Sequence, residues 1–325
     1  MITLEQAIEK IKVYKFRCSS LGRIMVENPQ VGITAKQEKE IETLIAKKEG
    51  KVLHKRTQKP LAFSDKDKET LEALVAKRDA EPELSVGVKS YLSTVLYDIL
   101  FNRKIEFTSP QTKKGNEVEE ESITLYTEVS GDLKIKNKDQ LSNDYIQGTP
   151  DLKIGIIEDM KNAFHLGTFP MFKDTYVSKS DHVWQTNGYK WLTNQTQSRV
   201  VYTLMDTPID IIKYKLEGLK RKLNKIDFTI DEKEHVVKLV TKHIFTHEGL
   251  KKFCDDPWTP GDISWFDDFV EIPAELRVKR FPIESTEESF ERDIERIKAR
   301  VVECRAEMIK MTRELYKKLE KRQAA

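Results

Sequence analysis

Apolar residues recur every three or four positions over several stretches of this 325-residue chain, which is the period of an amphipathic helix. The clearest stretches are residues 3–14, 34–48, 64–78 and 85–99. Two of them resemble each other at an offset of 30 residues, and each follows a favourable N-cap residue, Thr34 or Ser64. The pattern therefore predicts a helical hairpin over residues 34–80, inserted after an N-terminal part of the core, residues 1–33.

A different period appears near the middle of the chain, where short apolar runs alternate with polar residues as β-strands do. Residues 154–161 form the clearest run, and a period of two places Asp159 and Lys161 on one face of that strand. Asp151 lies on or just after the preceding run. A turn over residues 153–155 would fold the two runs into a hairpin and bring Asp151 beside Asp159.

Further elements surround this strand pair. An acidic helix after Gly115 precedes it, and a helix over residues 182–193 and a buried strand over residues 198–204 follow it. The order helix, two strands, helix, strand indicates an α/β core over residues 81–210. Residues 211–325 are predicted to form a mainly helical region.

The last part of the chain carries apolar residues at alternating spacings of four and three, which form the seam of a heptad repeat. The seam positions are Phe290, Ile294, Ile297, Val301, Cys304, Met308, Met311 and Leu315. This pattern predicts one long amphipathic helix. The helix could join chains into a homo-oligomer as a coiled coil or pack across its own domain, and Met and Cys in the seam favour the second arrangement.

Composition indicates a globular protein without a membrane span. Hydrophobic residues make up 38% of the chain, and the longest apolar runs are well short of the roughly 20 residues that a span needs. The N-terminal segment lacks the apolar core of a secretory signal, so we expect a cytoplasmic protein. Three widely spaced cysteines, Cys18, Cys254 and Cys304, argue against a disulfide framework and against a site with four thiolate ligands.

The charges nearly balance, with 56 basic and 54 acidic residues, so no global excess points to a nucleic-acid-binding protein. Any DNA-binding surface has to be local. The candidates are the basic stretches 47–59 and 213–225, each of which also fits a solvated helix face.

The predicted strand hairpin brings together groups that suit metal-dependent hydrolysis of a phosphodiester. Asp151 and Asp159 offer the oxygen ligands that Mg²⁺ prefers, and Lys161 offers a positive charge for the attacked phosphate. On its own, such a trio fits equally well a solvated strand edge with an ion pair. The interpretation as a site therefore depends on further residues.

Three further features lie where this chemistry would need them. Glu119 lies in the first turn of the acidic helix and could add a third carboxylate, although an acidic first turn also complements the helix dipole. Gln185 and Tyr189 share a helix face one turn apart. Arg17 and Ser20 belong to a donor-rich turn that suits a phosphate or helix capping.

Taken in order, these features resemble the phage-type branch of the PD-(D/E)XK nuclease superfamily, the group that includes lambda exonuclease, the YqaJ-like viral recombinases and the RecB nuclease domain. The motifs are RCSS near the start, Gly-x3-Glu ending at Glu119, Gly-Thr-Pro-Asp ending at Asp151, Asp159-x-Lys161 and Gln185-x3-Tyr189. The last motif is the most specific. The resemblance spans about residues 16–208 and implies a restriction-endonuclease-like core, with a central mixed sheet flanked by helices.

The resemblance also implies roles for individual residues. The implied catalytic residues are Lys161, Asp151, Asp159, Glu119, Gln185 and Tyr189. The implied ligands of Mg²⁺, or of Mn²⁺ in its place, are Glu119, Asp151 and Asp159. The implied substrate-binding residues are Arg17, Ser20 and Thr149. Many relatives have Glu where this chain has Asp159, an exchange that keeps the charge.

The implied activity is a Mg²⁺-dependent exonuclease on double-stranded DNA ends, acting 5′ to 3′ in phage-type recombination or DNA processing, with a single-strand annealing protein as a partner. We expect it in the cytoplasm of a bacterial or phage-infected cell. One alternative is a RecB-like nuclease on single strands or flaps. Another is an inactive nuclease fold that binds DNA ends as a scaffold, although a scaffold needs neither the acidic ligands nor Lys161.

Overall fold

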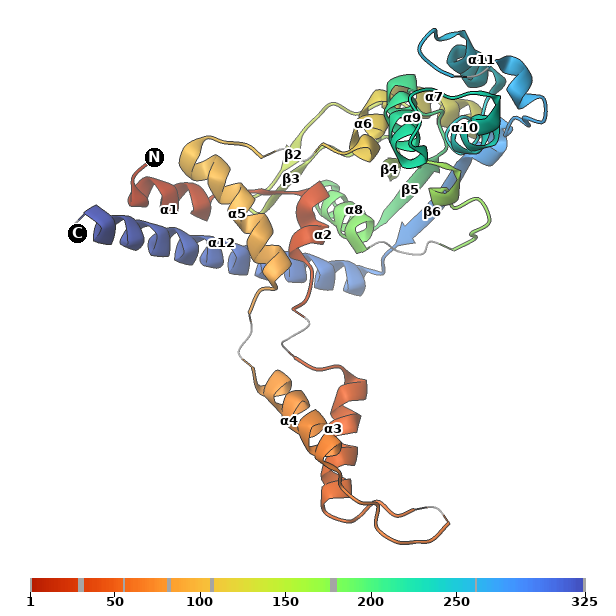
Figure 1. Cartoon of the computed structure of the whole chain (residues 1–325). Coiled ribbons are helices and arrows are strands. Elements are labelled where there is room, and N and C mark those ends of the chain that lie inside the picture. Colours follow the sequence, from red (N-terminus) through yellow and green to blue (C-terminus); the bar gives the residue numbers. More distant parts are fainter. Residues whose placement is uncertain are drawn as a thin grey trace. The chain divides into compact units, whose positions relative to one another are not determined.

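The structure is a computed structural model that describes residues 2–28, 32–54, 56–80, 83–105, 108–175, 180–260 and 262–323. The chain divides into two compact units. Figure 1 labels their helices and strands. The first unit consists of Met1–Lys12, Arg23–Lys104 and Val302–Ala325, and the second of Val13–Gly22 and Ile105–Val301. All strands of the described residues belong to the second unit, which also contains every predicted catalytic residue.

The first unit is helical. Its helices are α1 (Leu4–Lys12), α3 (Ala35–Lys48), α4 (Asp65–Asp79), α5 (Val86–Phe101) and the second half of α12 (Glu287–Gln323), while the short α2 (Leu21–Ile24) crosses the unit boundary. Ala7 and Ile11 are fully buried on α1, which packs against α5. Thr34 and Ser64 each form a capping box at the start of α3 and α4, as the sequence predicted.

Two three-stranded mixed sheets lie in the second unit. In the first, β3 (Ile146–Gly148) lies between β1 (Phe16–Arg17), which is parallel to it, and β2 (Leu141–Ser142), which is antiparallel. In the second, β5 (Gln197–Thr203) lies between the parallel β4 (Ile157–Asn162) and the antiparallel β6 (Val278–Glu284). The fold is thus mixed α/β, but two sheets stand where the sequence predicted one central sheet.

Two helices cover opposite faces of the second sheet. Tyr126 on α7 (Glu119–Ser130) belongs to the same buried cluster as Met160 of β4. Residues next to each other in a strand point to opposite faces, so Lys161 faces the other side, where it contacts Gln185 on α8 (Ser180–Thr193). The sheet is therefore flanked by helices, with the catalytic candidates of β4 on the α8 side.

Three helices of the second unit build a separate apolar cluster. They are α9 (Ile209–Leu223), α10 (Lys233–Val240) and α11 (His247–Asp255), whereas α6 (Pro110–Glu117) contacts α7 and β4. Short 3-10 turns occur at Cys18–Ser20, Leu166–Thr168, Ile230–Glu232, Ile263–Phe266 and Ala274–Arg277. Helices α9, α10 and α11 contribute Ile212, Val236 and Phe253 to that cluster.

The heptad seam lies on α12, as the sequence predicted. Five of its positions are buried within this chain, namely Phe290, Ile297, Val301, Cys304 and Met308. This burial favours a helix packed on its own protein over a coiled coil that joins chains. None of the described helices is long and apolar enough to cross a membrane.

Candidate active site

The predicted hairpin between Asp151 and Asp159 is present. Leu152 and Glu158 form an isolated antiparallel bridge and exchange backbone hydrogen bonds of 3.2 and 3.0 Å. Gly155 in the intervening turn has a φ of 79°, which glycine adopts without strain. The Asp151 carboxylate accepts a hydrogen bond of 2.7 Å from the backbone N–H of Met160, which fixes it beside β4.

Asp159 is fully buried, and its carboxylate is poorly satisfied. Lys161 Nζ lies 2.7 Å from Asp159 Oδ2 as an ion pair, while Oδ1 has no partner in the described structure. Burial raises the pKa of Asp159, and Lys161 opposes this shift. Burial, followed by the nearby charge of Asp159, raises the pKa of Asp151 to about 7. Two carboxylates thus share a site that holds too little positive charge.

Lys161 is held from the α8 side. Burial disfavours its ammonium, but the charges of Asp159 and Asp151 outweigh burial and raise the pKa of Lys161. Its Nζ donates a hydrogen bond of 3.2 Å to Gln185 Oε1, and Gln185 Nε2 donates one of 3.0 Å to the Tyr189 hydroxyl. Burial also raises the pKa of Tyr189, so this hydroxyl stays neutral. The structure therefore links Gln185 and Tyr189 to Lys161 in one chain of hydrogen bonds.

Close backbone packing brings α8 to this position. A Cβ atom at Gly148 would lie 2.7 Å from Tyr189 Cε1 and 2.8 Å from Cys18 Sγ. A Cβ atom at Gly188 would lie 2.6 Å from Leu21 Cδ1. Glycine is thus required at both positions for α8 to reach β3 and the turn that begins at Cys18. Burial raises the pKa of the Cys18 thiol to about 12, which makes it an inert packing group.

Glu119 lies near the two aspartates but has another partner. Its negative charge contributes to the raised pKa of Asp151, while its carboxylate accepts a hydrogen bond of 2.6 Å from Lys136 Nζ. Lys136 also donates to Glu120 at 3.2 Å. Among the described residues, no group of three or more Asp, Glu, His or Cys side chains could hold a metal ion as they stand. The site therefore combines Asp151 with Asp159 and leaves Glu119 bound to Lys136.

The residues predicted to bind a phosphate lie along the first sheet. Arg17 is exposed on β1 and is in register with Gln147 of β3. Thr149 follows β3 and is exposed, while Ser20 is partly exposed in the turn after β1. Because β1 and β3 are parallel, Arg17 and Thr149 lie toward the same end of the sheet. Their role as substrate-binding residues stays a prediction.

Glu158 is separate from this site, although it neighbours Asp159 in sequence. It lies on the opposite face of β4 and is only 1% exposed. The Glu158 carboxylate accepts hydrogen bonds of 2.7 Å from Arg199 and 2.6 Å from the Tyr126 hydroxyl, and Lys134 lies 3.2 Å away. Glu158 is therefore a satisfied structural carboxylate, in contrast to Asp159.

The residues of the candidate active site fit a divalent metal ion, because the carboxylates of Asp151 and Asp159 lack enough positive charge nearby. The unpartnered Oδ1 of Asp159 and the raised pKa of Asp151 both describe a surplus of buried negative charge. Carboxylate oxygens are the ligands that Mg²⁺ prefers. Glu119 could join Asp151 and Asp159 only if it released Lys136.

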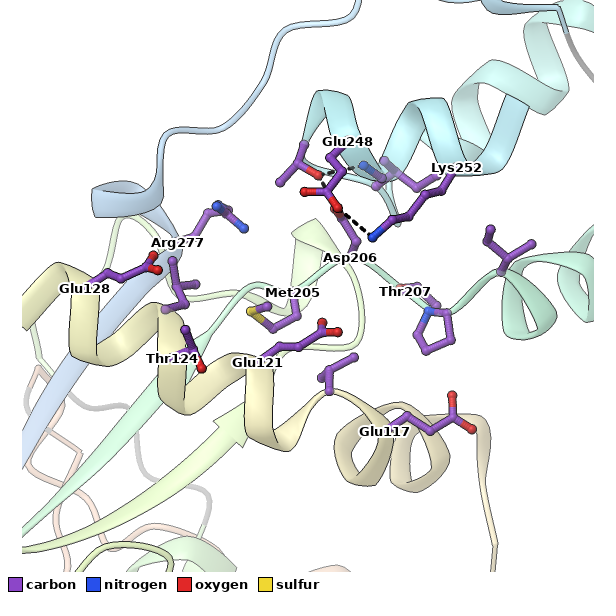
Figure 2. A pocket seen from close by; sticks show the side chains of 17 residues that line it. Glu117, Glu121, Thr124, Glu128, Met205, Asp206, Thr207, Glu248, Lys252 and Arg277 are labelled. Atoms are coloured by element: carbon purple, nitrogen blue, oxygen red, sulfur yellow. Dashed lines mark hydrogen bonds and ion pairs between the residues drawn. The ribbon is translucent and has the colours of Figure 1, made fainter. Parts of the chain in front are cut away.

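A separate cavity of about 580 Å³ is lined by residues of α7 and α11, among others (Figure 2). Glu117, Glu121 and Glu128 line one side of it, and Glu248 and Lys252 line the other as an ion pair of 2.7 Å. In the described part of the chain, its lining includes none of the predicted catalytic residues. The cavity is thus distinct from the candidate active site.

The sequence matches no protein-family model and no curated protein. Among solved structures, it is similar to a phage-related exonuclease from Haemophilus somnus 129PT, at 22% identity and a TM-score of 0.54, over 95% of this chain and 99% of that one. It also has a weaker likeness to the alkaline exonuclease LHK-Exo from Laribacter hongkongensis, at 12% identity and a TM-score of 0.40, over 72% of this chain and 87% of that one. The first likeness shows that this chain shares its mixed α/β fold with that exonuclease.

Proposed function

We propose that this protein is a divalent-metal-dependent DNA exonuclease that acts at duplex ends. The observation that carries the proposal is the buried cluster of Asp151, Asp159 and Lys161, in which one oxygen of the Asp159 carboxylate has no partner and the other has only Lys161. A fold shared with a phage-related exonuclease supports DNA ends as the substrate class.

Asp151 and Asp159 would hold the metal, because they are the adjacent carboxylates with an unmet need for positive charge. Mg²⁺, when bound, would supply the positive charge that stabilises the attacked phosphate. Glu119 would become a third ligand by exchanging Lys136 for the metal, an exchange that is feasible because the Glu119 side chain is 29% exposed.

Lys161 would act on the reacting phosphodiester. Its raised pKa keeps it an ammonium, so it would donate hydrogen bonds to the phosphate oxygens and to the attacking water. Gln185 would fix the direction of the Lys161 amine, and Tyr189 would fix Gln185. Hydrolysis would leave the phosphate on the 5′ side of the new end.

Arg17, Ser20 and Thr149 would bind the terminal 5′-phosphate, which would set a 5′ to 3′ direction. Two of these residues are exposed near one end of the first sheet, where they could reach a ligand. An Arg side chain is suited to phosphate because it donates two parallel hydrogen bonds. By this proposal, a 5′-phosphorylated end is a better substrate than a 5′-hydroxyl end.

A single set of substrates distinguishes this function from two others, a RecB-like nuclease and a DNA-end-binding scaffold. The full-length protein would be incubated in Mg²⁺ with linear duplexes labelled at either end, 5′-phosphorylated or not, and with single strands, flaps and closed circular duplex. The proposal expects mononucleotides from linear duplexes and an intact circle. Preferred cleavage of flaps or single strands would support a RecB-like nuclease, and binding to ends without cleavage would support a scaffold.

A further inference from the structure

The segment that joins α3 to α4 is a basic feature outside the candidate active site. Figure 1 shows the two helices side by side, with this segment at the end of their hairpin. We call the described residues of this segment, 48–54 and 56–60, the arm tip. It overlaps one of the two basic stretches that the proposed catalytic mechanism leaves unexplained.

The end of α3 fixes the first half of the arm tip. Gly50 has a φ of 70°, the left-handed conformation that commonly ends a helix. The N–H of Lys51 donates to the carbonyl of Ala46 at 2.9 Å, and the N–H of Gly50 donates to that of Lys47 at 3.1 Å. These two bonds form a Schellman motif, which sets the direction in which the chain leaves the helix.

The second half of the arm tip is a small antiparallel turn. Leu53 and Pro60 form an isolated bridge, and the N–H of His54 donates to the carbonyl of Lys59 at 2.8 Å. Inside the turn, His54 Nδ1 accepts hydrogen bonds from the backbone N–H groups of Arg56 and Thr57 at 3.3 and 3.2 Å. The arm tip therefore has a defined conformation, which lowers the entropy cost of binding a ligand.

The base of the arm tip is also fixed. Lys47 at the end of α3 forms an ion pair of 2.6 Å with Asp67 in the first turn of α4, and both side chains are mostly buried. Asp67 in turn belongs to the capping box of Ser64. The ends of the two helices are thus tied together where the arm tip begins and ends.

The charges on the arm tip are largely uncompensated. Lys48, Lys51, Arg56 and Lys59 are exposed, and the described residues of the arm tip include one acidic side chain, Glu49, which pairs with Lys51 at 2.6 Å. Within the described structure, Lys48, Arg56 and Lys59 have no ion-pair partner. A cluster of exposed, unpaired cations on an ordered turn fits a polyanion.

The hairpin does little for the hydrophobic core. Helix α3 buries Ile41 and Leu44, and α4 buries no residue. A helix that buries no side chain fully gains little stability from burial of apolar surface. Leu53 is the one large apolar side chain of the arm tip that is exposed, at 45%, among the residues described, so this surface is not suited to insertion into a lipid bilayer.

We propose that the arm tip binds the phosphate backbone of duplex DNA through Lys48, Arg56 and Lys59, as a sequence-independent contact additional to the active site. The inference rests on the proposed function for the choice of DNA as the polyanion. The slope of log K against log salt concentration is negative, and each phosphate neutralised by such a cation adds about 0.9 to its magnitude. Three contacts would therefore account for about 2 to 3 units of that slope.

The test compares three full-length proteins that all carry Asp151→Asn, which prevents hydrolysis of the probe. The first has no other change, and the second carries Lys48→Gln, Arg56→Gln and Lys59→Gln. The third is a control that loses the same charge from exposed positions of α12, through Lys317→Gln, Lys318→Gln and Lys321→Gln. Binding of a fluorescent duplex in Mg²⁺ is measured by anisotropy over a series of salt concentrations.

Relative to the protein with Asp151→Asn alone, the magnitude of the slope should fall by about 2 to 3 units in the arm-tip variant and by less than 1 unit in the control. Equal slopes in the two variants would overturn the proposal, as would a lack of duplex binding by the protein with Asp151→Asn alone. Hydrolysis by the wild-type protein is scored separately. If that hydrolysis is absent while the arm-tip variant still loses its slope, the nuclease proposal fails and the arm-tip contact stands.

Discussion

Replacing Asp159 by Asn should stabilise the metal-free protein while abolishing its activity. Asn keeps the shape of the side chain and removes a buried charge whose described contacts are limited to Lys161 at Oδ2. The raised pKa of Asp159 gives the sign, because it means that folding favours the neutral carboxyl over the carboxylate even with Lys161 nearby. Lys161 would keep Asp151 as its counter-charge.

The size of the gain follows from the pKa of Asp151. A rise from 3.8 to about 7 corresponds to roughly 4 kcal/mol, at about 1.4 kcal/mol per unit. Burial causes more of this rise than the charge of Asp159 does, so we assign about 1–2 kcal/mol to Asp159. In a unit of this size, such a gain raises Tm by roughly 2–4 °C per kcal/mol.

The gain should also depend on pH in a defined direction. Between pH 3.8 and about 7, Asp151 binds more protons in the folded protein than in the unfolded one, so the wild-type protein loses stability as the pH rises through this window. The difference between Asp159→Asn and wild type should therefore be largest at pH 7 and above and become small near pH 4.

Calorimetry in EDTA and in Mg²⁺ tests this reasoning. In EDTA the Asp159→Asn protein should melt above wild type. Mg²⁺ should raise the Tm of wild type and not that of Asp159→Asn, because a ligand that binds only the folded state adds about 2.7 kcal/mol at 100 times its Kd. Asp132→Asn, which removes an exposed carboxylate, is the control and should have the Tm of wild type both in EDTA and in Mg²⁺. A lower Tm for Asp159→Asn in EDTA, or an equal Mg²⁺ effect on both proteins, would refute the account.

Two other substitutions, at Glu158 and Lys114, should change the stability of the protein. Glu158→Gln should destabilise the protein by about 3–5 kcal/mol in urea unfolding, because it leaves Arg199 and Lys134 without their buried carboxylate, and a change below 1 kcal/mol would contradict this. Burial lowers the pKa of the fully buried Lys114 to about 7. Between pH 7 and 10 the folded protein therefore binds fewer protons than the unfolded one. The free energy of unfolding of wild type should rise by about 1.4 kcal/mol per pH unit relative to that of Lys114→Met. Parallel stability curves for the two proteins across this pH range would count against that shift.

Local sequence rules predicted the elements that local chemistry determines. Thr34 and Ser64 mark the starts of α3 and α4 because their side chains accept the first free N–H groups of the helix. The hairpin that joins Asp151 to β4 followed from a period of two and a turn. The same period correctly placed Glu158 on the face opposite Asp159.

Features that depend on distant residues escaped this reasoning. Strand β6 was missed because Pro282 and alternating charges weaken its pattern, yet an edge strand tolerates a proline. The partner of Glu119 was missed because Lys136 lies in a segment without helical or strand periodicity. The division into two sheets was missed because the strands of the first sheet are only two or three residues long, too short to show a period.

The most direct measurement of the central claim is the rate of mononucleotide release from a 5′-phosphorylated linear duplex by wild type, Lys161→Ala and Asp132→Asn in Mg²⁺. Loss of an electrostatic contact to the transition state costs about 10²–10³ in rate, so Lys161→Ala should fall by at least that factor, while Asp132→Asn matches wild type and EDTA stops all three. Circular dichroism checks that each variant is folded. Release by folded Lys161→Ala at the wild-type rate, or release that continues in EDTA, would contradict the assignment of this cluster as the active site.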